Sequence, residues 1–340
     1  MKYRNLGRTG VQVSELCLGT MMFGGKTEEA ESMDIIDKAL DGGINFVDTA
    51  NVYSRGRSEE VVGKAFKRNG KRSKIVLSTK ARQRMDDEDP NGEGLSRRHI
   101  IEQCEKSLER LQTDYIDIYI MHRPMSSIPI DETLRALDDL VRSGKVRYLG
   151  ASNFAAWQMM ESLWVSKELG LNRFVVAQPP YNLMDRRVER EVVPMCRSYG
   201  IGIMAWSPLA GGYLTGKYKR GQERPGEARH ATRTPDTTGA LFSDRAFDVA
   251  ETLEKMGKEK GCSASQIALT WCKLQPGITS PIIGPRTMEH LEDNIGSLSV
   301  NLTEEDLAAI DAVAPPGRAV SPYFQPDVIN TDFGPHRFRW

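Results

Sequence analysis

The chain has 340 residues, and its 46 Lys and Arg residues balance 46 Asp and Glu residues, so the formal net charge is zero. This balance argues against a nucleic-acid-binding protein, because phosphate recognition normally requires a basic excess. Hydrophobic residues make up 39% and charged residues 27%, which excludes a disordered chain. The length fits one α/β barrel, and we expect residues 1–340 to form a single domain.

The cysteines and the N-terminal segment indicate a cytoplasmic protein. The five cysteines are scattered without a CxxC spacing, so we expect reduced thiols. The first residues lack the apolar segment of a signal peptide, and no run of about 18 apolar residues is long enough to cross a membrane. We therefore expect no membrane partner.

Short β-branched runs alternate with amphipathic stretches along almost the whole chain. Residues 1–14 come first, and their alternation around Gly7 and Gly10 predicts a β-hairpin. Eight predicted strands follow, at residues 16–19, 45–49, 75–80, 115–122, 146–152, 174–178, 202–206 and 279–284. Apolar residues recur three and four apart between them, as at Ile100, Cys104 and Leu108, and predict outer helices. Eight strand–helix units favour an α/β fold of the (β/α)8 TIM barrel type over an open doubly wound sheet.

Two segments fall outside this repeat. Residues 216–239 follow the seventh strand and are rich in Gly, Pro and Arg, which predicts a lid, with disorder as the alternative. The tail from Pro315 combines Pro with aromatic residues. We expect the tail over the barrel mouth, at a subunit contact or wrapped on the surface.

The predicted strands end on groups that are able to do chemistry. In this fold, reacting groups lie at the C-terminal strand ends and in the loops that follow. Each such residue alone has a structural explanation, such as a turn-forming Asp or a wall histidine. The strand ends carry Gly19, Asp48, Lys80, His122, Ser152 with Asn153, Gln178, Trp206 with Ser207, and Gly284. Together, these side chains are expected to converge on one barrel mouth.

Four of these positions suit proton donation to a carbonyl oxygen. Tyr53 follows Asp48 by five residues and is able to reach back over the mouth. A phenol titrates at about 10, and a neighbouring ammonium such as Lys80 is expected to lower that pKa. Asp48 would keep Lys80 charged, and His122 would hydrogen-bond a substrate oxygen. The set suits a general acid acting on a carbonyl that becomes an alkoxide.

A reduction also needs a hydride source, and the later strand ends offer a cofactor cradle. No GxGxxG follows a strand, so a Rossmann pyrophosphate loop is absent. Ser152, Asn153 and Gln178 are able to hydrogen-bond a carboxamide, and Trp206 is able to stack on a flat ring. Residues 284–294 place a glycine turn and Arg286 at a predicted helix N-terminus, which favours phosphate.

Other chemistries find less support. The five histidines include no HxH or HExxH pair, so we expect no catalytic metal. No GxSxG elbow is present, and Cys17 lacks a basic partner nearby in sequence. A Schiff base on Lys80 stays an alternative, but it gives no role to Trp206, Gln178 or Arg286.

Several separated motifs resemble the aldo-keto reductase superfamily over essentially the whole chain. They are GGINFVDTA at residues 42–50 with Tyr53, STK at 78–80, DYID at 114–117 with MHRP at 121–124, and GKVRYLGASNF at 144–154. The resemblance implies NADPH-dependent interconversion of carbonyl compounds and alcohols. It also implies that Tyr53 is the general acid, that Lys80 and Asp48 tune it, and that His122 orients the carbonyl.

The resemblance further implies a set of cofactor contacts. The set is Gly19, Thr20, Met21, Asp48, Ser152, Asn153, Gln178, Trp206, Ser207, Pro208, Leu209, Gly211, Lys217, Arg224, Ile283, Gly284, Arg286, His290, Asp293 and Asn294. Residues 207–211 would line the pyrophosphate, and residues 284–294 would hold the adenosine and its 2′-phosphate. His290 stands where relatives often have Gln. Arg286 favours NADPH over NADH.

The substrate is expected to be a small carbonyl compound in an apolar pocket with one cation. The residues predicted to contact it are Met22, Phe23, Tyr53, Met85, His122 and Arg123. The WSPL motif at 206–209 and the long seventh loop are similar to the bacterial and potassium-channel β-subunit branch. A cofactor-binding regulatory subunit is therefore the alternative function, although such subunits commonly depart from the family at the position of His122. The sequence leaves the oligomeric state open.

Overall fold

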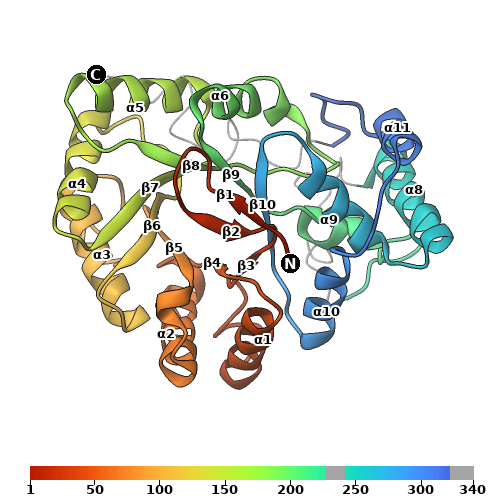
Figure 1. The fold of residues 1–340 in the computed structure, drawn as a ribbon, viewed down its shortest axis with the longest axis horizontal. Helices are drawn as coiled ribbons and strands as arrows, with labels where there is room; N and C mark the ends of the chain where they lie inside the picture. Colours follow the sequence, from red (N-terminus) through yellow and green to blue (C-terminus); the bar gives the residue numbers. More distant parts are fainter. Residues whose placement is uncertain (227–241, 322–340) are drawn as a thin grey trace.

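A computed structural model of the protein describes residues 1–226 and 242–321. Eight parallel strands close into a barrel in the order β10-β3-β4-β5-β6-β7-β8-β9 (Figure 1). The strands are β3 (Cys17–Gly19), β4 (Phe46–Asp48), β5 (Val76–Ala81), β6 (Ile116–Met121), β7 (Val146–Ser152), β8 (Phe174–Gln178), β9 (Gly202–Ala205) and β10 (Ile278–Ile283). Each bound lies within one residue of its prediction. The TIM-barrel fold is confirmed.

Helices surround the barrel (Figure 1). Their apolar residues pack in the core between strands and helices. In α4, for example, Leu134, Leu137 and Leu140 are buried while Arg135 and Asp139 face outward. The helices are α1 (Glu29–Asp41), α2 (Arg57–Asn69), α3 (Arg97–Leu111), α4 (Ile130–Arg142), α5 (Ala156–Glu168), α6 (Val192–Tyr199), α8 (Asp244–Lys260), α9 (Ala264–Leu274), α10 (Met288–Gly296) and α11 (Glu304–Val313).

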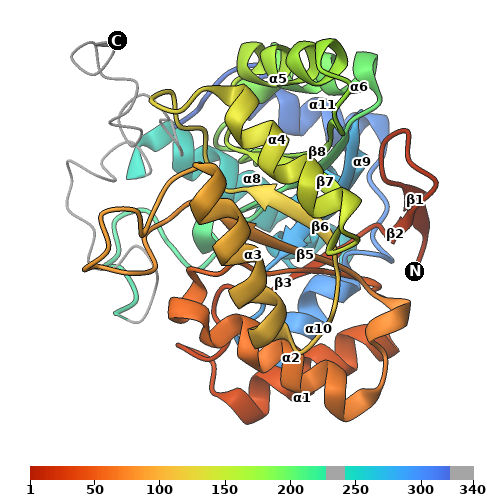
Figure 2. The ribbon, with the colours of Figure 1, turned by 90° about the vertical axis from the view of Figure 1, so that its left-hand side faces the viewer.

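The predicted hairpin is present and covers the N-terminal end of the barrel (Figure 2). Strands β1 (Tyr3–Asn5) and β2 (Gln12–Ser14) pair antiparallel. The Arg4 guanidinium donates to Ile278 O at 3.0 Å, where β10 begins. Gly7 has φ = 58°, and a Cβ at this position would lie 2.4 Å from Gly200 O. Only glycine fits this position in the hairpin turn, which packs against the backbone of residues 200–202.

The core has two apolar layers. The larger layer lies between the strands and the helices. The smaller layer fills the inside of the barrel and consists of Leu6, Val13, Cys17, Phe46, Ile118, Ile120, Val176 and Met204. Leu6 and Val13 come from the hairpin segment, so this segment completes the inner layer. All five cysteines are free, as predicted, and four of them are buried.

The two long segments are described only in part. Residues 216–226 contain no helix or strand, and residues 227–239 of the predicted lid lie outside the described residues. The start of the tail packs beside the loop that follows β8, because Val320 N donates to Met184 O at 2.9 Å. The tail from residue 322 lies outside the described residues. In the described part of the chain, no helix has the length and apolar character to cross a membrane.

Candidate active site

A buried ion pair joins the C-terminal ends of β4 and β5. Lys80 Nζ lies 2.6 Å from Asp48 Oδ2, and the exposed fractions of Lys80 and Asp48 are 0% and 2%. The other carboxylate oxygen, Asp48 Oδ1, accepts hydrogen bonds from Ser78 Oγ at 2.7 Å and Gln178 Nε2 at 2.9 Å. The carboxylate is therefore bound on both sides, which is what a buried charge requires.

The Lys80 ammonium has three donors, and each has a partner. Besides Asp48, Nζ donates to Thr49 O at 2.6 Å and to Tyr53 Oη at 3.2 Å. Burial disfavours the charged amine, but the Asp48 and Tyr53 oxygens outweigh burial and raise the pKa of Lys80. Because an ammonium only donates, Tyr53 Oη is the acceptor, and its own O–H is able to point to another oxygen.

A tight turn, η1 (Tyr53–Gly56), presents Tyr53 at the mouth. The three residues after it, Ser54, Arg55 and Gly56, have φ values of 48°, 54° and 97°. Such left-handed backbone costs free energy for residues other than glycine, so the surroundings must hold it in place. A Cβ on Gly56 would lie 2.8 Å from Cδ of Arg110, which packs over the turn.

Arg110 is in turn fixed by a carboxylate that is fully buried. Arg110 Nε donates to Glu59 Oε2 at 2.7 Å, and Thr79 Oγ1 donates to Glu59 Oε1 at 2.5 Å. Thr79 precedes Lys80 on β5, on the opposite face of the strand. Glu59 thus ties the turn that carries Tyr53 to the strand that carries Lys80.

His122 follows β6 and meets Tyr53 edge to face. The two ring centroids lie 5.8 Å apart with an interplanar angle of 80°. Burial lowers the pKa of His122 well below its ordinary value, and the cations of Lys80, Arg123 and Arg82 lower it further. His122 is therefore neutral near pH 7. Its Nδ1 is buried without a hydrogen-bond partner among the described residues.

The polar groups predicted to hold a carboxamide form one hydrogen-bonded row. Ser152 Oγ donates to Gln178 O at 2.8 Å, and Asn153 Nδ2 donates to Ser152 Oγ at 2.9 Å. Trp206 Nε1 donates to Asn153 Oδ1 at 3.1 Å. The side-chain amide of Gln178, however, donates to Asp48, so it contacts the Asp48–Lys80 ion pair.

The loop after β9 folds into a compact turn that is closed by its own hydrogen bonds. Gly211 N donates to Ser207 Oγ at 3.1 Å, and both residues have positive φ. Pro208 is buried and Leu209 is half-buried. Lys217 Nζ reaches back over this turn, because a Cβ on Gly212 would lie 2.6 Å from it.

The predicted phosphate site lies at the start of α10. Thr287 caps the helix, accepting from His290 N at 3.3 Å, and Arg286 precedes the cap. Burial and the positive charges of Arg286 and Lys217 lower the pKa of His290. Two cations from distant segments of the chain therefore lie near the start of α10. Cations beside a helix N-terminus fit a phosphate group.

The other predicted cofactor contacts differ in exposure. Asn294 and Ile283 are buried, and Gly284 is exposed, with no atom within 4 Å of the position that a Cβ would take. Asp293 Oδ1 already accepts from Ser263 Oγ at 2.7 Å and from Gln266 Nε2 at 3.1 Å. Arg224 lies over the Phe242 ring at 3.9 Å, in the loop after β9.

The loop after β3 contributes both exposed and buried residues. Gly19 and Thr20 are buried, and Thr20 N donates to Asp48 O at 3.0 Å. Met21 is exposed and Met22 half-buried. Phe23, in contrast, is fully buried in the outer core layer, so its side chain packs in the interior. Of the remaining predicted substrate contacts, Met85 and Arg123 are half-buried in the loops after β5 and β6.

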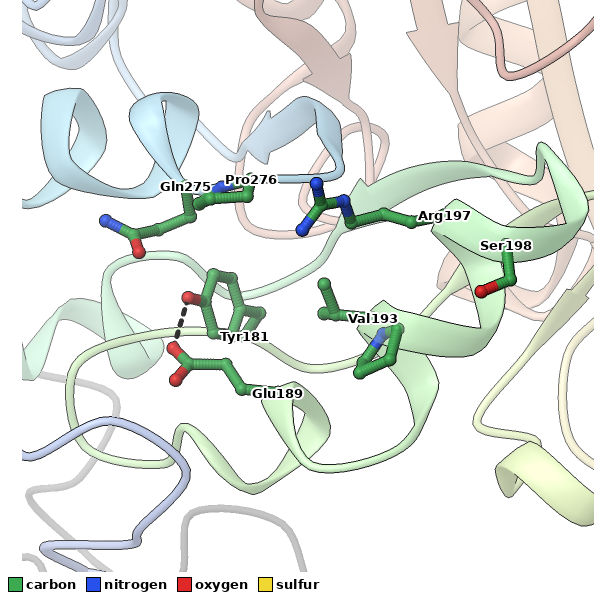
Figure 3. Close-up of a pocket in the computed structure, with 8 residues that line it drawn as sticks. Tyr181, Glu189, Val193, Arg197, Ser198, Gln275 and Pro276 are labelled. Atoms are coloured by element: carbon green, nitrogen blue, oxygen red, sulfur yellow. Dashed lines mark hydrogen bonds between the residues drawn. The ribbon is translucent and has the colours of Figure 1, made fainter.

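A separate cavity of about 560 Å³ lies outside the barrel (Figure 3). It is lined by Tyr181, Glu189, Val193, Pro194, Arg197, Ser198, Gln275 and Pro276. Tyr181 Oη donates to Glu189 Oε1 at 2.5 Å across it. No residue of the Asp48–Lys80–Tyr53 set lines this cavity, so it is separate from the candidate site at the barrel mouth.

Three groups in this site were not predicted. Ser78 donates to Asp48. This contact could have been predicted from the two-residue period of a strand, which puts Ser78 and Lys80 on the same face of β5. The contacts of Glu59 and Arg110 could not be predicted from the sequence in this way, because they depend on how the helices pack. The described residues contain no group of three His, Cys, Asp or Glu side chains that could hold a metal ion.

Comparison with known proteins gives a family match and close relatives. The Aldo/keto reductase family model matches residues 15–315. An uncharacterized oxidoreductase of Bacillus subtilis is 41% identical over 323 residues, covering 93% of this chain and 96% of the relative. A protein of Oryza sativa named "probable voltage-gated potassium channel subunit beta" is 38% identical over 319 residues, covering 92% and 96%. The versiconal hemiacetal acetate reductase of Aspergillus parasiticus is 35% identical over 340 aligned residues, covering 92% and 96%.

Proposed function

Because the chain belongs to the aldo/keto reductase family, we propose that it is an NADPH-dependent oxidoreductase that reduces aldehydes or ketones to alcohols. The observation that supports this proposal most directly is the buried Lys80 ammonium, which contacts both the Asp48 carboxylate and Tyr53 Oη. The free cysteines fit the further proposal that the enzyme is cytoplasmic.

Tyr53 is the general acid in this proposal. As negative charge develops on the carbonyl oxygen, Tyr53 transfers its proton to that oxygen. The phenolate left behind is stabilised by Lys80, whose charge is held in place by Asp48. Because Lys80 stays charged and is already oriented, little reorganisation is needed during the reaction.

His122 orients the carbonyl as a neutral hydrogen-bond donor. Its pKa is lowered by burial and by neighbouring cations, so the ring does not compete with Tyr53 as an acid near neutral pH. The ring also lies edge-on to Tyr53 and limits where the substrate oxygen is able to sit. These two side chains define one position for that oxygen.

The residues at the other side of the mouth fit NADPH. Asn153, Ser152 and Trp206 would hold the nicotinamide end, and Ser207 with Gly211 would face the pyrophosphate. Arg286 and Lys217 supply the cations that a 2′-phosphate or pyrophosphate requires. When bound, NADPH supplies the hydride that completes the reduction. Residues 19–21, Pro208, Leu209, Arg224 and Ile283 would complete the contact surface.

A second candidate function has support from the Oryza sativa relative. A cofactor-binding regulatory subunit would need the same cradle but little chemistry. The complete set of Asp48, Tyr53, Lys80 and His122 favours the reductase. A panel of aldehydes and ketones, followed by NADPH absorbance, separates the two: the reductase turns over several of them, whereas a regulatory subunit binds NADPH with negligible turnover.

The variant Tyr53→Phe tests the proposed acid. We expect carbonyl reduction to fall by about 10²- to 10⁴-fold, because only the transition state needs the proton. NADPH affinity, measured by fluorescence titration, should change little. Undiminished reduction by this variant would rule out Tyr53 as the acid.

The variant Arg286→Ala tests the cofactor preference. Loss of one charge-assisted contact is expected to weaken NADPH by about ten- to a hundredfold and NADH much less. Arg318→Ala, in the described start of the tail, serves as the matched control. An unchanged NADPH to NADH preference would place the 2′-phosphate elsewhere.

A further inference from the structure

We propose that Glu59 and Arg110 are positioning residues, which keep Tyr53 in contact with the active-site ammonium and so set the rate of proton transfer. The proposal rests on the reductase function above and adds to it two residues that the mechanism does not use. Neither was among the predicted site residues. Both lie where α2 and α3 pack together beside β5, and both act through the turn that carries Tyr53.

The turn between Tyr53 and α2 is held internally by local bonds alone. Tyr53 N donates to Ala50 O at 3.1 Å, and Arg55 N donates to Val52 O at 3.0 Å. Gly56 is the N-cap of α2, with φ = 97°, and a glycine has no side chain that could accept from the first N–H groups of the helix. These bonds reach only three residues back, so they shape the turn without fixing its position relative to β5.

The Arg110 side chain packs against this glycine from α3. A Cβ on Gly56 would lie 2.8 Å from Arg110 Cδ and 3.1 Å from its Nε, so the turn contacts both the stem and the head of the arginine. Arg110 reaches the turn because α2 and α3 approach closely: a Cβ on Gly63 would lie 2.6 Å from Arg110 O. The arginine therefore supports the turn from outside.

A buried carboxylate fixes the direction of this arginine. Glu59 is fully buried, and its Oε2 accepts from Arg110 Nε at 2.7 Å. The other carboxylate oxygen accepts from Thr79 Oγ1 at 2.5 Å, and Thr79 directly precedes Lys80 on β5. A planar guanidinium that is bonded in this way has one orientation. The turn that carries the acid is thus aligned on the strand that carries the lysine.

The start of α2 is anchored to the barrel on its other side by a different residue. Ser58 Oγ donates to Thr20 O at 2.8 Å, just after β3. Ser58 precedes Glu59, so the two neighbours bond opposite sides of the same helix end. Loss of the Glu59–Arg110 pair should therefore release the turn on the β5 side and leave the β3 side in place.

The distance that this support controls is the 3.2 Å between Lys80 Nζ and Tyr53 Oη. The other two partners of the ammonium, Asp48 and Thr49 O, lie at 2.6 Å and belong to β4 and the residue after it. Lys80 is therefore fixed independently of the turn, and a displaced turn lengthens only the bond to Tyr53. A misplacement of about 1 Å in an active site is able to slow a reaction by about a hundredfold.

A role in stability alone does not require charged side chains at this place. Apolar residues of similar volume commonly replace a buried ion pair without loss of stability, because removing the charges from water offsets their attraction. Glu59 is 0% and Arg110 17% exposed. What the charged pair adds is a single direction for the side chain that touches the turn, and the proposal explains that direction.

The double variant Glu59→Leu/Arg110→Met, made in the full-length protein and assayed with NADPH, tests the proposal. We expect kcat to fall by about ten- to a hundredfold while the KM for NADPH stays unchanged, because the cofactor cradle is untouched. Its urea midpoint should exceed that of Arg110→Met, which leaves a buried carboxylate unpaired. Arg110→Lys, which keeps the charge and the stem, should recover several-fold in kcat over Arg110→Met. A folded double variant with wild-type kcat overturns the proposal.

The pH profile separates positioning from a general loss of structure. Reduction needs the protonated phenol, so kcat falls once the pH is high enough to ionise Tyr53. Because the Lys80 ammonium favours the phenolate, a weaker contact shifts this fall to higher pH, by about one unit in the double variant. Arg142→Met is the control, since Arg142 binds the buried Asp138 at 2.5 Å just before β7 begins. It should keep the wild-type profile, and an unmoved profile in the double variant contradicts the proposal.

Hydrogen exchange tests the same support without turnover. The amides of Tyr53 and Arg55 should exchange about tenfold faster in the double variant, because the turn opens more often, and at the wild-type rate in Arg142→Met. If the double variant does not fold, Thr79→Val replaces it, since this change removes only the bond between Glu59 and β5. Unchanged exchange overturns the proposal. A wild-type protein that reduces no aldehyde or ketone overturns the reductase function instead.

Discussion

Two ion pairs lie at opposite ends of the barrel and serve different purposes. At the C-terminal end, Lys80 lies 2.6 Å from Asp48 and also contacts Tyr53. At the N-terminal end, Arg72 lies 2.8 Å from Asp117 on β6. Both carboxylates are largely removed from water. The difference lies in the third partner of each cation.

At the N-terminal end, the Arg72 guanidinium bonds only groups that do not change their protonation near neutral pH. Arg72 donates to Tyr115 O at 2.7 Å and Ile75 O at 3.1 Å, and it stacks on the Tyr115 ring at 4.0 Å. Arg147 covers the other face of that ring at 3.8 Å. An arginine with these contacts fixes strand positions. At the C-terminal end, the cation is Lys80, which is bonded to the phenol of Tyr53. The same kind of ion pair is therefore able to assist proton transfer there.

Lys80→Met should produce the largest effect, because it damages both chemistry and folding. Removing the ammonium leaves the Asp48 charge buried, which is expected to cost about 3–5 kcal/mol of unfolding free energy. Carbonyl reduction should fall by orders of magnitude. Urea denaturation and steady-state kinetics measure the two losses. The double variant Asp48→Asn/Lys80→Met should regain stability without activity; if it regains neither, the stability loss is not due to the unpaired carboxylate.

Arg72→Met should destabilise the protein without affecting the reaction. Asp117 would keep a hydrogen bond from Leu77 N at 3.0 Å and the distant Arg147 at 3.9 Å. We expect a loss of about 2–3 kcal/mol, because the Arg72–Asp117 pair is slightly more exposed than the Lys80–Asp48 pair. The kcat of the folded fraction should equal that of the wild type. Arg147→Met, which removes an exposed cation, should cost less. A fall in kcat for Arg72→Met would show that the two ends are coupled.

Gly56→Ala tests whether the turn after Tyr53 positions this side chain beside the Lys80–Asp48 pair. A methyl group at φ = 97° would meet Arg110, so we expect a loss of about 1–2 kcal/mol and a lower kcat as Tyr53 moves. Gly70→Ala is the control, because Gly70 ends the same helix with φ = 66° and has no atom near its Cβ. It should lose stability but keep kcat. An equal kcat in both variants would contradict a positioning role for this turn.

The smallest expected effect is that of His122 on the free energy of unfolding, and it is visible as a pH dependence of stability. Its pKa is lowered in the folded protein, so the unfolded chain binds the proton more tightly. Folding free energy present above about pH 6.5 is therefore lost as the pH falls toward the folded pKa. Between pH 7.5 and 5.5, wild type should lose about 1 kcal/mol more than His122→Asn. Parallel stability curves for the two proteins would contradict a neutral His122 in the folded protein.

The strands were predicted to within one residue because each is a short apolar run, bounded by turns, inside a buried parallel sheet. The groups at their ends followed from the same pattern, since parallel strands end on one side. Contacts of Lys80 with Asp48 and Tyr53 were also expected from their chemistry, but other contacts of these groups were not. That Gln178 binds Asp48 depends on two strands 130 residues apart, and that Phe23 is buried depends on how its loop folds inward. Such contacts come from tertiary packing, which local periodicity does not record.

The position of β10 between β9 and β3 has a consequence for biosynthesis. Until residue 283 has left the ribosome, β3 and β9 both expose unpaired edges, and such edges invite association with other chains. The N-terminal segment emerges first, but Arg4 must wait for residues 273–278 before it finds its two backbone acceptors, Lys273 O and Ile278 O. The nascent chain therefore depends on its last quarter to close, and truncation before residue 278 should leave an aggregation-prone, protease-sensitive product.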